Sequence, residues 1–216
     1  MRITREFITD PSCFLSLPLY KLDGASIRSE DARGHLCVVT GATWTSQGRA
    51  VDATDDYITL TAIQPMPAQG TISIWAYKSD WGGGGTRALF DCGDANNRFL
   101  LYRQTDNTSR LLITTVTVDQ VDINGGVLSG AGWKYFEVLY GLNNTSLFID
   151  LVQQGVTDTS CTMPTFAAGW VTRLGNFFSA TNGAFGGTIG EVIIHNRQLT
   201  FPERRNLWLA TKWRYR

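Results

Sequence analysis

The chain has 216 residues, of which 43% are hydrophobic and 12% aromatic, with 19 basic and 19 acidic side chains. This length fits one β-sandwich domain or at most two small domains, and it suffices to bury a core without disulfides. The hydrophobic content excludes intrinsic disorder, and the balanced charge argues against a nucleic-acid partner. Residues 1–10 lack the apolar stretch of a secretion signal, and no apolar run is long enough to span a membrane, so we expect no membrane partner either.

The N-terminal region divides at residue 13. Residues 1–12 are polar and mixed, so we expect an N-terminal arm followed by a single domain over residues 13–216, including a C-terminal helix and basic tail. Residues 13–20 are apolar but contain Pro18. Proline has no N–H to donate to a neighbouring strand, so this segment is expected to be an edge strand or a bulged strand.

The cysteines are scattered and form no C-x-x-C pair; they are Cys13, Cys37, Cys92 and Cys161. Two disulfides are one interpretation, and four small buried thiols are the other. We favour reduced thiols because the sequence shows no secretion signal.

Three aspartates crowd one predicted turn: Asp52, Asp55 and Asp56. Several carboxylates close together could hold calcium, which prefers oxygen ligands. Short carboxylates that accept backbone N–H groups explain the same residues as an Asx-type turn. Because the spacing lacks the twelve-residue loop of an EF-hand, we favour the turn and predict no metal and no other cofactor.

Period-two patterns dominate the middle of the chain. Residues 70–77 alternate Ile72, Ile74 and Ala76 with a second set of side chains, which predicts a strand. Further strands are expected at 88–91, 98–103, 111–118, 133–140, 146–151 and 189–194. The Asn-Gly-Gly sequence at 124–126 predicts a turn. Serial short strands with glycine-rich turns predict an all-β sandwich.

The last twenty residues predict a helix near 201–212. Thr200 and Glu203 have the spacing of a capping box, and Pro202 lies in the first turn, where a missing N–H costs nothing. Residues 197–216 contain six basic side chains and one acid. Such a segment could bind nucleic acid or a membrane, but we favour a helix that docks on the sandwich and exposes its charges.

The segment GTIGEVIIHNRQLTFPE, residues 187–203, resembles a signature near the C-terminus of laminin-G-like domains. The predicted hairpin WKYFEVLY…SLFIDL is similar to another segment of these domains. The resemblance implies a concanavalin A-like jelly roll of two antiparallel sheets with a short C-terminal helix. The chain departs from the pattern at Gly190, usually aspartate, and at Leu151, usually glycine. The second departure predicts that the turn after Asp150 is displaced toward Gly155.

Residues 17–44 and the terminal ATKWRYR resemble laminin-G-like proteins encoded by tailed bacteriophages and found in viral metagenomes. That resemblance implies a non-catalytic virion protein, assembled in the host cytoplasm, that decorates a capsid or forms part of a tail. Its implied partners are capsid or tail proteins and surface glycans. Repeated weak contacts favour a homo-oligomer.

The alternative function for this fold is a carbohydrate-active enzyme. Laminarinase-type jelly rolls carry their paired carboxylates as E-x-D-x-x-E, and this motif is absent from the chain. Glu137 and Asp150 lie on neighbouring predicted strands and could meet by chance, outside any such motif. We therefore expect no catalytic residues and no enzyme activity.

Four residues are our candidate ligand contacts. Trp81, beside the loop SDWGGGGTR, is expected to be exposed, and its ring and that of Trp170 could cover the apolar face of a sugar. Tyr102 and Arg103 leave a predicted strand and could add a hydrogen bond and a charge. Packing inside the protein is the competing explanation for each of them.

Overall fold

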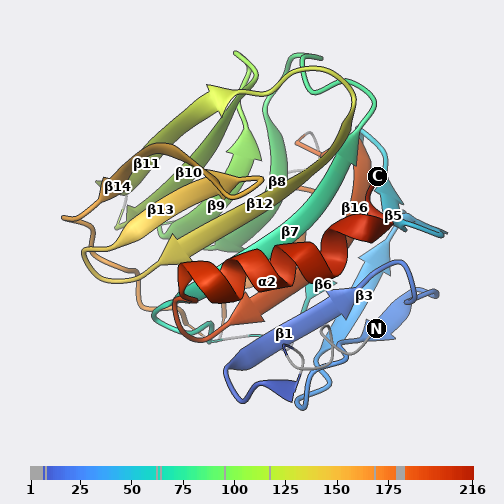
Figure 1. Ribbon diagram of the computed structural model, residues 1–216, viewed down its shortest axis with the longest axis horizontal. Coiled ribbons are helices and arrows are strands. Elements are labelled where there is room, and N and C mark those ends of the chain that lie inside the picture. The colour runs from blue at the N-terminus through green and yellow to red at the C-terminus, as the bar shows by residue number, and fades with distance from the viewer. Residues whose placement is uncertain are drawn as a thin grey trace.

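The computed structural model describes residue 7 and residues 9–61, 63, 65–94, 96–116, 118–167, 169–178 and 183–216. Two antiparallel sheets face each other, and one helix crosses the outer face of one sheet (Figure 1). This architecture confirms the predicted all-β sandwich with a short C-terminal helix. Of the predicted N-terminal arm, residues 1–6 and 8 lie outside the described residues, and Phe7 packs against a small apolar cluster that includes Cys13 and Leu207.

Sheet A runs in the order β14 (Val152–Asp158), β13 (Thr145–Ile149), β12 (Gly132–Tyr140), β7 (Gly70–Lys78), β16 (Gly187–His195), β5 (Gly48–Val51), β4 (Thr43–Thr45), and β1 (Cys13–Pro18) also pairs with β16. Sheet B runs in the order β11 (Val118–Val127), β10 (Thr108–Thr115), β9 (Arg98–Arg103), β8 (Arg87–Gly93), β15 (Val171–Leu174), β6 (Tyr57–Leu60), β3 (Leu36–Thr40), β2 (Ser26–Arg28). After β16 come α2 (Phe201–Thr211) and the 3-10 turn η1 (Lys212–Arg214).

Strand β1 behaves as its proline predicts. Among the described strands it pairs with β16 alone, and its register shifts between Cys13 and Leu15. It is therefore both an edge strand and an irregular one.

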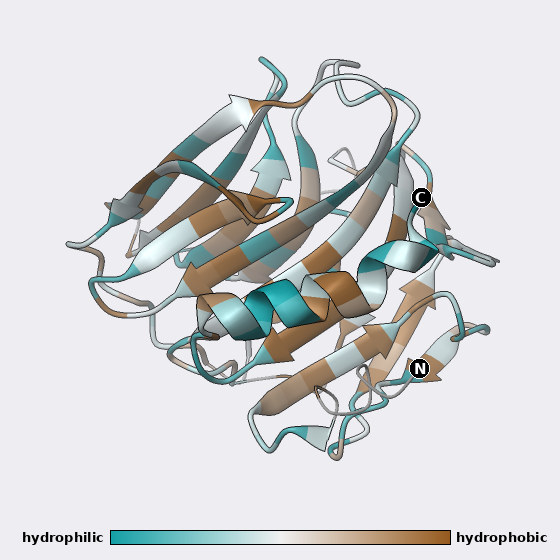
Figure 2. Ribbon diagram, in the orientation of Figure 1, coloured by the Kyte–Doolittle hydropathy of each residue, from teal (hydrophilic) through white to brown (hydrophobic). Residues whose placement is uncertain are grey.

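Side chains alternate across β7, the central strand of sheet A. Ile72, Ile74 and Ala76 lie in the core between the sheets and are at most 1% exposed. Trp75 lies on the opposite face, where it packs with Tyr135 in a separate aromatic cluster. Figure 2 shows apolar segments recurring along β7 and β1. Sheet A is buried on both faces, because α2 covers its outer face.

Two turn predictions are wrong. The segment 124–126 lies inside β11, paired with β10 through an irregular register. A Cβ on Gly125 would lie 2.3 Å from the Ser109 hydroxyl, so the glycine permits a close approach of strands rather than a turn. The chain reverses at Asp150 and Leu151, both with positive φ, directly between β13 and β14. That turn is therefore not displaced toward Gly155, which lies within β14.

The helix start is built as the capping box predicts. Thr200 has extended φ and ψ angles, and Glu203 Oε2 accepts hydrogen bonds from both its N–H, at 2.7 Å, and its hydroxyl, at 2.8 Å. Arg197 donates to both oxygens of the same carboxylate. This ion pair lowers the pKa of Glu203 to about 2.

Replacing Thr200 by alanine should lower the free energy of unfolding by about 1 kcal/mol, because the first turn of α2 loses its capping hydroxyl. The measurement is a urea titration, in which the midpoint falls and the slope stays unchanged. Thr200→Ser keeps the hydroxyl and is the control. Equal midpoints for the alanine variant and the native chain would show that the cap contributes nothing.

All four cysteines are buried, and none of them forms a disulfide. Burial raises the pKa of Cys13 and Cys37 to about 12, so both are inert small side chains in this environment. Within the described residues, no helix is long and apolar enough to cross a membrane.

Candidate functional site: an aromatic groove at the C-terminal tail

The C-terminal tail, residues 212–216, is anchored on the outer face of sheet A by Tyr215. The Tyr215 ring stacks on Trp75, with centroids 4.8 Å apart, and contacts Trp133 at 4.5 Å. Gly190 of β16 provides the space, since a Cβ there would lie 2.4 Å from the Tyr215 ring. The glycine that stands in place of the usual aspartate therefore admits the tail.

A buried ion pair holds the tail beside this aromatic contact. Arg214 Nη1 donates to Glu191 Oε2 at 3.1 Å, and the Glu191 side chain is 2% exposed. Burial raises the pKa of Glu191 to about 7, against the opposing effect of the Arg214 charge. The Arg214 guanidinium also lies over the rings of Tyr20, at 4.7 Å, and Trp213, at 4.8 Å. These contacts fix the arginine in one orientation.

A groove of about 370 Å³ opens between the tail and the connection from β4 to β5. Figure 1 shows the C-terminal end of the chain beside β5. The groove is lined by Tyr20, Ser46, Gln47, Trp213, Arg214 and Tyr215. Trp213 is 57% exposed, and its Nε1 donates to the Ala210 carbonyl at 2.9 Å. One indole is therefore held in place while much of its surface is open to solvent.

A second exposed indole is held by the backbone of Tyr20. Trp44 of β4 is 44% exposed, and its Nε1 donates to the Tyr20 carbonyl at 3.1 Å. Exposed aromatic faces, one amide, the hydroxyl-bearing side chains of Tyr20, Ser46 and Tyr215, and a fixed guanidinium thus gather in and beside one groove. This mixture of flat apolar surface with a few polar groups is typical of small-molecule sites.

Trp81 does not lie on the surface, and the expectation that it is exposed is wrong. It is 1% exposed, its Nε1 donates to the Gly132 carbonyl, and its ring packs against Phe136 and Phe185. The residues that follow Trp81 are glycines, which offer only polar backbone. The indole ring itself lies in the core, because a large apolar ring is more stable there.

Two of the other three candidates are also buried, and the third is half-buried. Arg103 is 3% exposed and donates hydrogen bonds to the carbonyls of Trp81 and Gly85, so this buried side chain stabilises the glycine loop. Trp170 is 6% exposed and packs edge-on against Phe166, in a different place. Tyr102 is half-buried.

Trp81, Tyr102 and Arg103 are brought together, but around a cavity of only about 10 Å³. No sugar fits such a space. The roles of all four residues in binding stay predictions, and three of them are out of a ligand's reach in this conformation.

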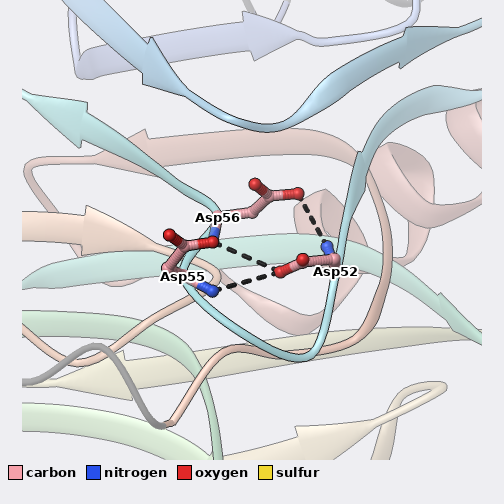
Figure 3. Close-up of side chains that lie close together, drawn as sticks. All are labelled: Asp52, Asp55 and Asp56. Carbon is pink, nitrogen blue, oxygen red and sulfur yellow. Dashed lines mark hydrogen bonds between the residues drawn. The ribbon is translucent and has the colours of Figure 1, made fainter.

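Asp52, Asp55 and Asp56 do lie together, with one oxygen of each within 4.8 Å of the others (Figure 3). Asp52 Oδ1 accepts the backbone N–H groups of Thr54, at 2.8 Å, and Asp55, at 3.1 Å, while Asp56 Oδ2 accepts the Asp52 N–H. The hydrogen bonds lower the pKa of Asp52. These bonds are those of the Asx-type turn, and they account for the cluster.

The sequence predicts a docking helix with a basic tail and does not predict the groove. The available signal was the alternation of aromatic and basic residues in Trp213, Arg214 and Tyr215. No local pattern joined this segment to Tyr20 and Gln47, because β1, β5 and β16 bring them together only in the folded sheet.

Comparison with known proteins places the fold. The sequence model of Laminin_G_3, described as Concanavalin A-like lectin/glucanases superfamily, matches residues 52–203. No curated protein matches the chain.

Solved structures with the same fold are distant in sequence. Trypanosoma rangeli sialidase in complex with sialic acid has 14% identity and a TM-score of 0.75, over 96% of this chain and 34% of that one. Domain 4 of AbnA, a GH43 extracellular arabinanase from Geobacillus stearothermophilus in complex with arabinotriose, has 17% identity and a TM-score of 0.70, over 93% and 98%. The botulinum neurotoxin serotype D binding domain has 9% identity and a TM-score of 0.69, over 93% and 52%. The chain thus spans about a third of the sialidase length, and at these identities the likeness extends to the fold alone.

Proposed function

Because the chain belongs to the Concanavalin A-like lectin/glucanases superfamily, we propose that it is a non-catalytic module that binds carbohydrate in the aromatic groove. The fold hosts binding modules and enzymes alike, so the fold cannot decide between them. Two of the similar structures are carbohydrate-active proteins, and one is an arabinanase domain in complex with arabinotriose. They support a saccharide as the class of ligand.

The observation that carries the proposal is the fixed, exposed indole of Trp213 at the edge of the groove. The face of an aromatic ring is electron-rich, and the C–H groups on one face of a pyranose are weakly positive, so the two stack favourably. Gln47 and Ser46 line the same groove and offer an amide and a hydroxyl to sugar hydroxyl groups.

Trp213→Ala should weaken binding to any recognised glycan about tenfold or more, the usual effect of removing a central tryptophan contact. A glycan array identifies the ligand, and isothermal titration then compares the native and variant proteins. Phe201→Ala is the matched control, because Phe201 is also 57% exposed but lies at the opposite end of α2. Glycan binding that survives loss of Trp213 would place the site elsewhere.

The alternative function is a glycosidase, and the carboxylates argue against it. Glu137 is fully buried under α2, where Arg204 and Tyr135 hold its two oxygens. Glu191 is buried behind Arg214. A glycosidase needs two carboxyl groups that reach the scissile bond. The release of reducing ends from polysaccharides by the purified chain would favour the enzyme.

The virion role rests on the resemblance of residues 17–44 and the terminal segment to bacteriophage-encoded proteins. We place the chain on the surface of a particle, with capsid or tail proteins as partners and with several copies that bind glycans by avidity. Mass spectrometry of purified particles, and light scattering of the isolated chain, test this location and the predicted homo-oligomer. A monomer absent from particles would contradict both.

A further inference from the structure

The guanidinium of Arg214 is fixed where a groove ligand would meet it. Its side chain is 14% exposed, and it lines the groove beside Tyr20 and Trp213, whose rings it overlies. Among the described residues, Glu191 is its one hydrogen-bond acceptor, through Nη1. A guanidinium carries five N–H donors. Donors beyond those used by Glu191 are therefore available on a group that needs no further ordering.

The charges around the groove are unbalanced. Lys212, Arg214 and Arg216 all belong to the tail, and none of the described residues that line the groove is acidic. Lys21, next to Tyr20, is paired with Glu30 at 3.4 Å. The carboxylate that pairs with Arg214 is Glu191, which is 2% exposed and does not line the groove. A ligand approaching from solvent meets positive charge first.

Glu191 compensates Arg214 only in part. Burial, together with the charge of Glu30, raises the pKa of this carboxyl to about 7, and the charges of Arg214 and Lys21 oppose the rise. Near neutral pH, part of the protein carries a neutral Glu191 beside a charged Arg214. That state has an uncompensated cation at the groove.

We infer that the groove selects acidic saccharides, with Arg214 binding a sugar carboxylate while Trp213 stacks on the ring. The inference rests on the proposed function and specifies its ligand. A planar guanidinium matches a planar carboxylate with two parallel hydrogen bonds, which gives geometric selectivity as well as charge. The aromatic contact alone does not distinguish an acidic sugar from a neutral one.

The test uses an array on which each acidic glycan is printed beside a neutral counterpart, such as a uronate beside its methyl ester and a sialylated chain beside its desialylated form. Sulfated glycans form a third set. The native protein should bind carboxylated members about tenfold more tightly than their neutral partners, the range of a charge-assisted hydrogen bond. A preference for sulfated over carboxylated glycans would overturn the carboxylate assignment.

Three variants separate this inference from the proposed function. Arg214→Gln combined with Glu191→Gln removes both charges without leaving a buried carboxylate unpaired, and it should abolish the acidic preference. Glu191→Gln alone leaves Arg214 uncompensated and should strengthen acidic binding. Trp213→Ala should lose acidic and neutral glycans together.

Each result has one meaning. Equal binding of acidic glycans and their neutral counterparts, still dependent on Trp213, would contradict the inference but not the proposed function. An acidic preference that persists in the double variant also overturns the role of Arg214. Failure to bind any glycan rejects the proposed function and the inference with it.

Discussion

Arg204→Leu should lower the free energy of unfolding by about 3–5 kcal/mol at pH 8, the usual cost of leaving a buried charge without its partner. Arg204 is 4% exposed, its Nε donates to Glu137 Oε2, and its guanidinium lies 3.7 Å from the centre of the Phe148 ring. Glu137 is itself fully buried beneath α2. Without the arginine, the carboxylate keeps the hydrogen bond that the Tyr135 hydroxyl donates at 3.2 Å, but it loses its paired cation.

The cost should depend on pH in a defined direction. Burial already raises the pKa of Glu137, with Arg204 opposing the rise. Removing the arginine raises that pKa further, so the folded variant binds a proton more readily than the unfolded chain. Its stability is then highest below the ordinary glutamate pKa and falls as the pH rises through the folded pKa. Urea midpoints at pH 4.5 and pH 8 should therefore differ more for the variant than for the native protein.

The matched control is the double variant Glu137→Leu with Arg204→Leu, which replaces the ion pair by apolar side chains. Such replacements are often neutral or stabilising. The double variant should recover most of the loss and lose the added pH dependence. If the single and double variants are equally unstable, the loss comes from packing of α2 and not from the stranded charge.

Much of the fold could be predicted because its signals are local. The alternation around Ile74 and the spacing of Thr200 and Glu203 depend on residues a few positions apart, and both match the structure. The turn at Asp150 and Leu151 was not predictable in the same way. A non-glycine residue with positive φ is costly in isolation, and here the pairing of β13 with β14 and two hydrogen bonds between Asp150 and Tyr135 maintain it.

The site was harder to predict because its contacts are remote in sequence. Trp81 and Trp213 both stand beside polar or flexible residues, yet one is buried and the other exposed. What decides between them is the neighbouring structure. Phe185 and Phe136 enclose Trp81, whereas nothing among the described residues covers the outer face of Trp213 to a similar degree.

His195→Gln should change the pH dependence of the free energy of unfolding. His195 ends β16 and is fully buried, and burial lowers its pKa to about 4 from an ordinary value of 6.5. Because the unfolded chain binds a proton more readily, this group's contribution is complete above pH 6.5 and is lost as the pH falls toward 4. Relative to the variant, the native protein should lose about 2 kcal/mol between pH 7 and pH 5.

The quantity to compare is the difference in unfolding free energy between the native protein and His195→Gln, because Glu191 changes the stability with pH in the opposite direction. Its pKa is raised to about 7, so its contribution to stability falls as the pH rises from 4.5 to 7 and partly cancels that of His195 in the native curve. Glu191 is unchanged in His195→Gln, and its effect subtracts out. Asp10 and Arg197, which also act on His195, are likewise common to both proteins. Urea midpoints at half-unit steps from pH 5 to pH 7 give the two curves, and parallel curves would mean that His195 is not held neutral by burial.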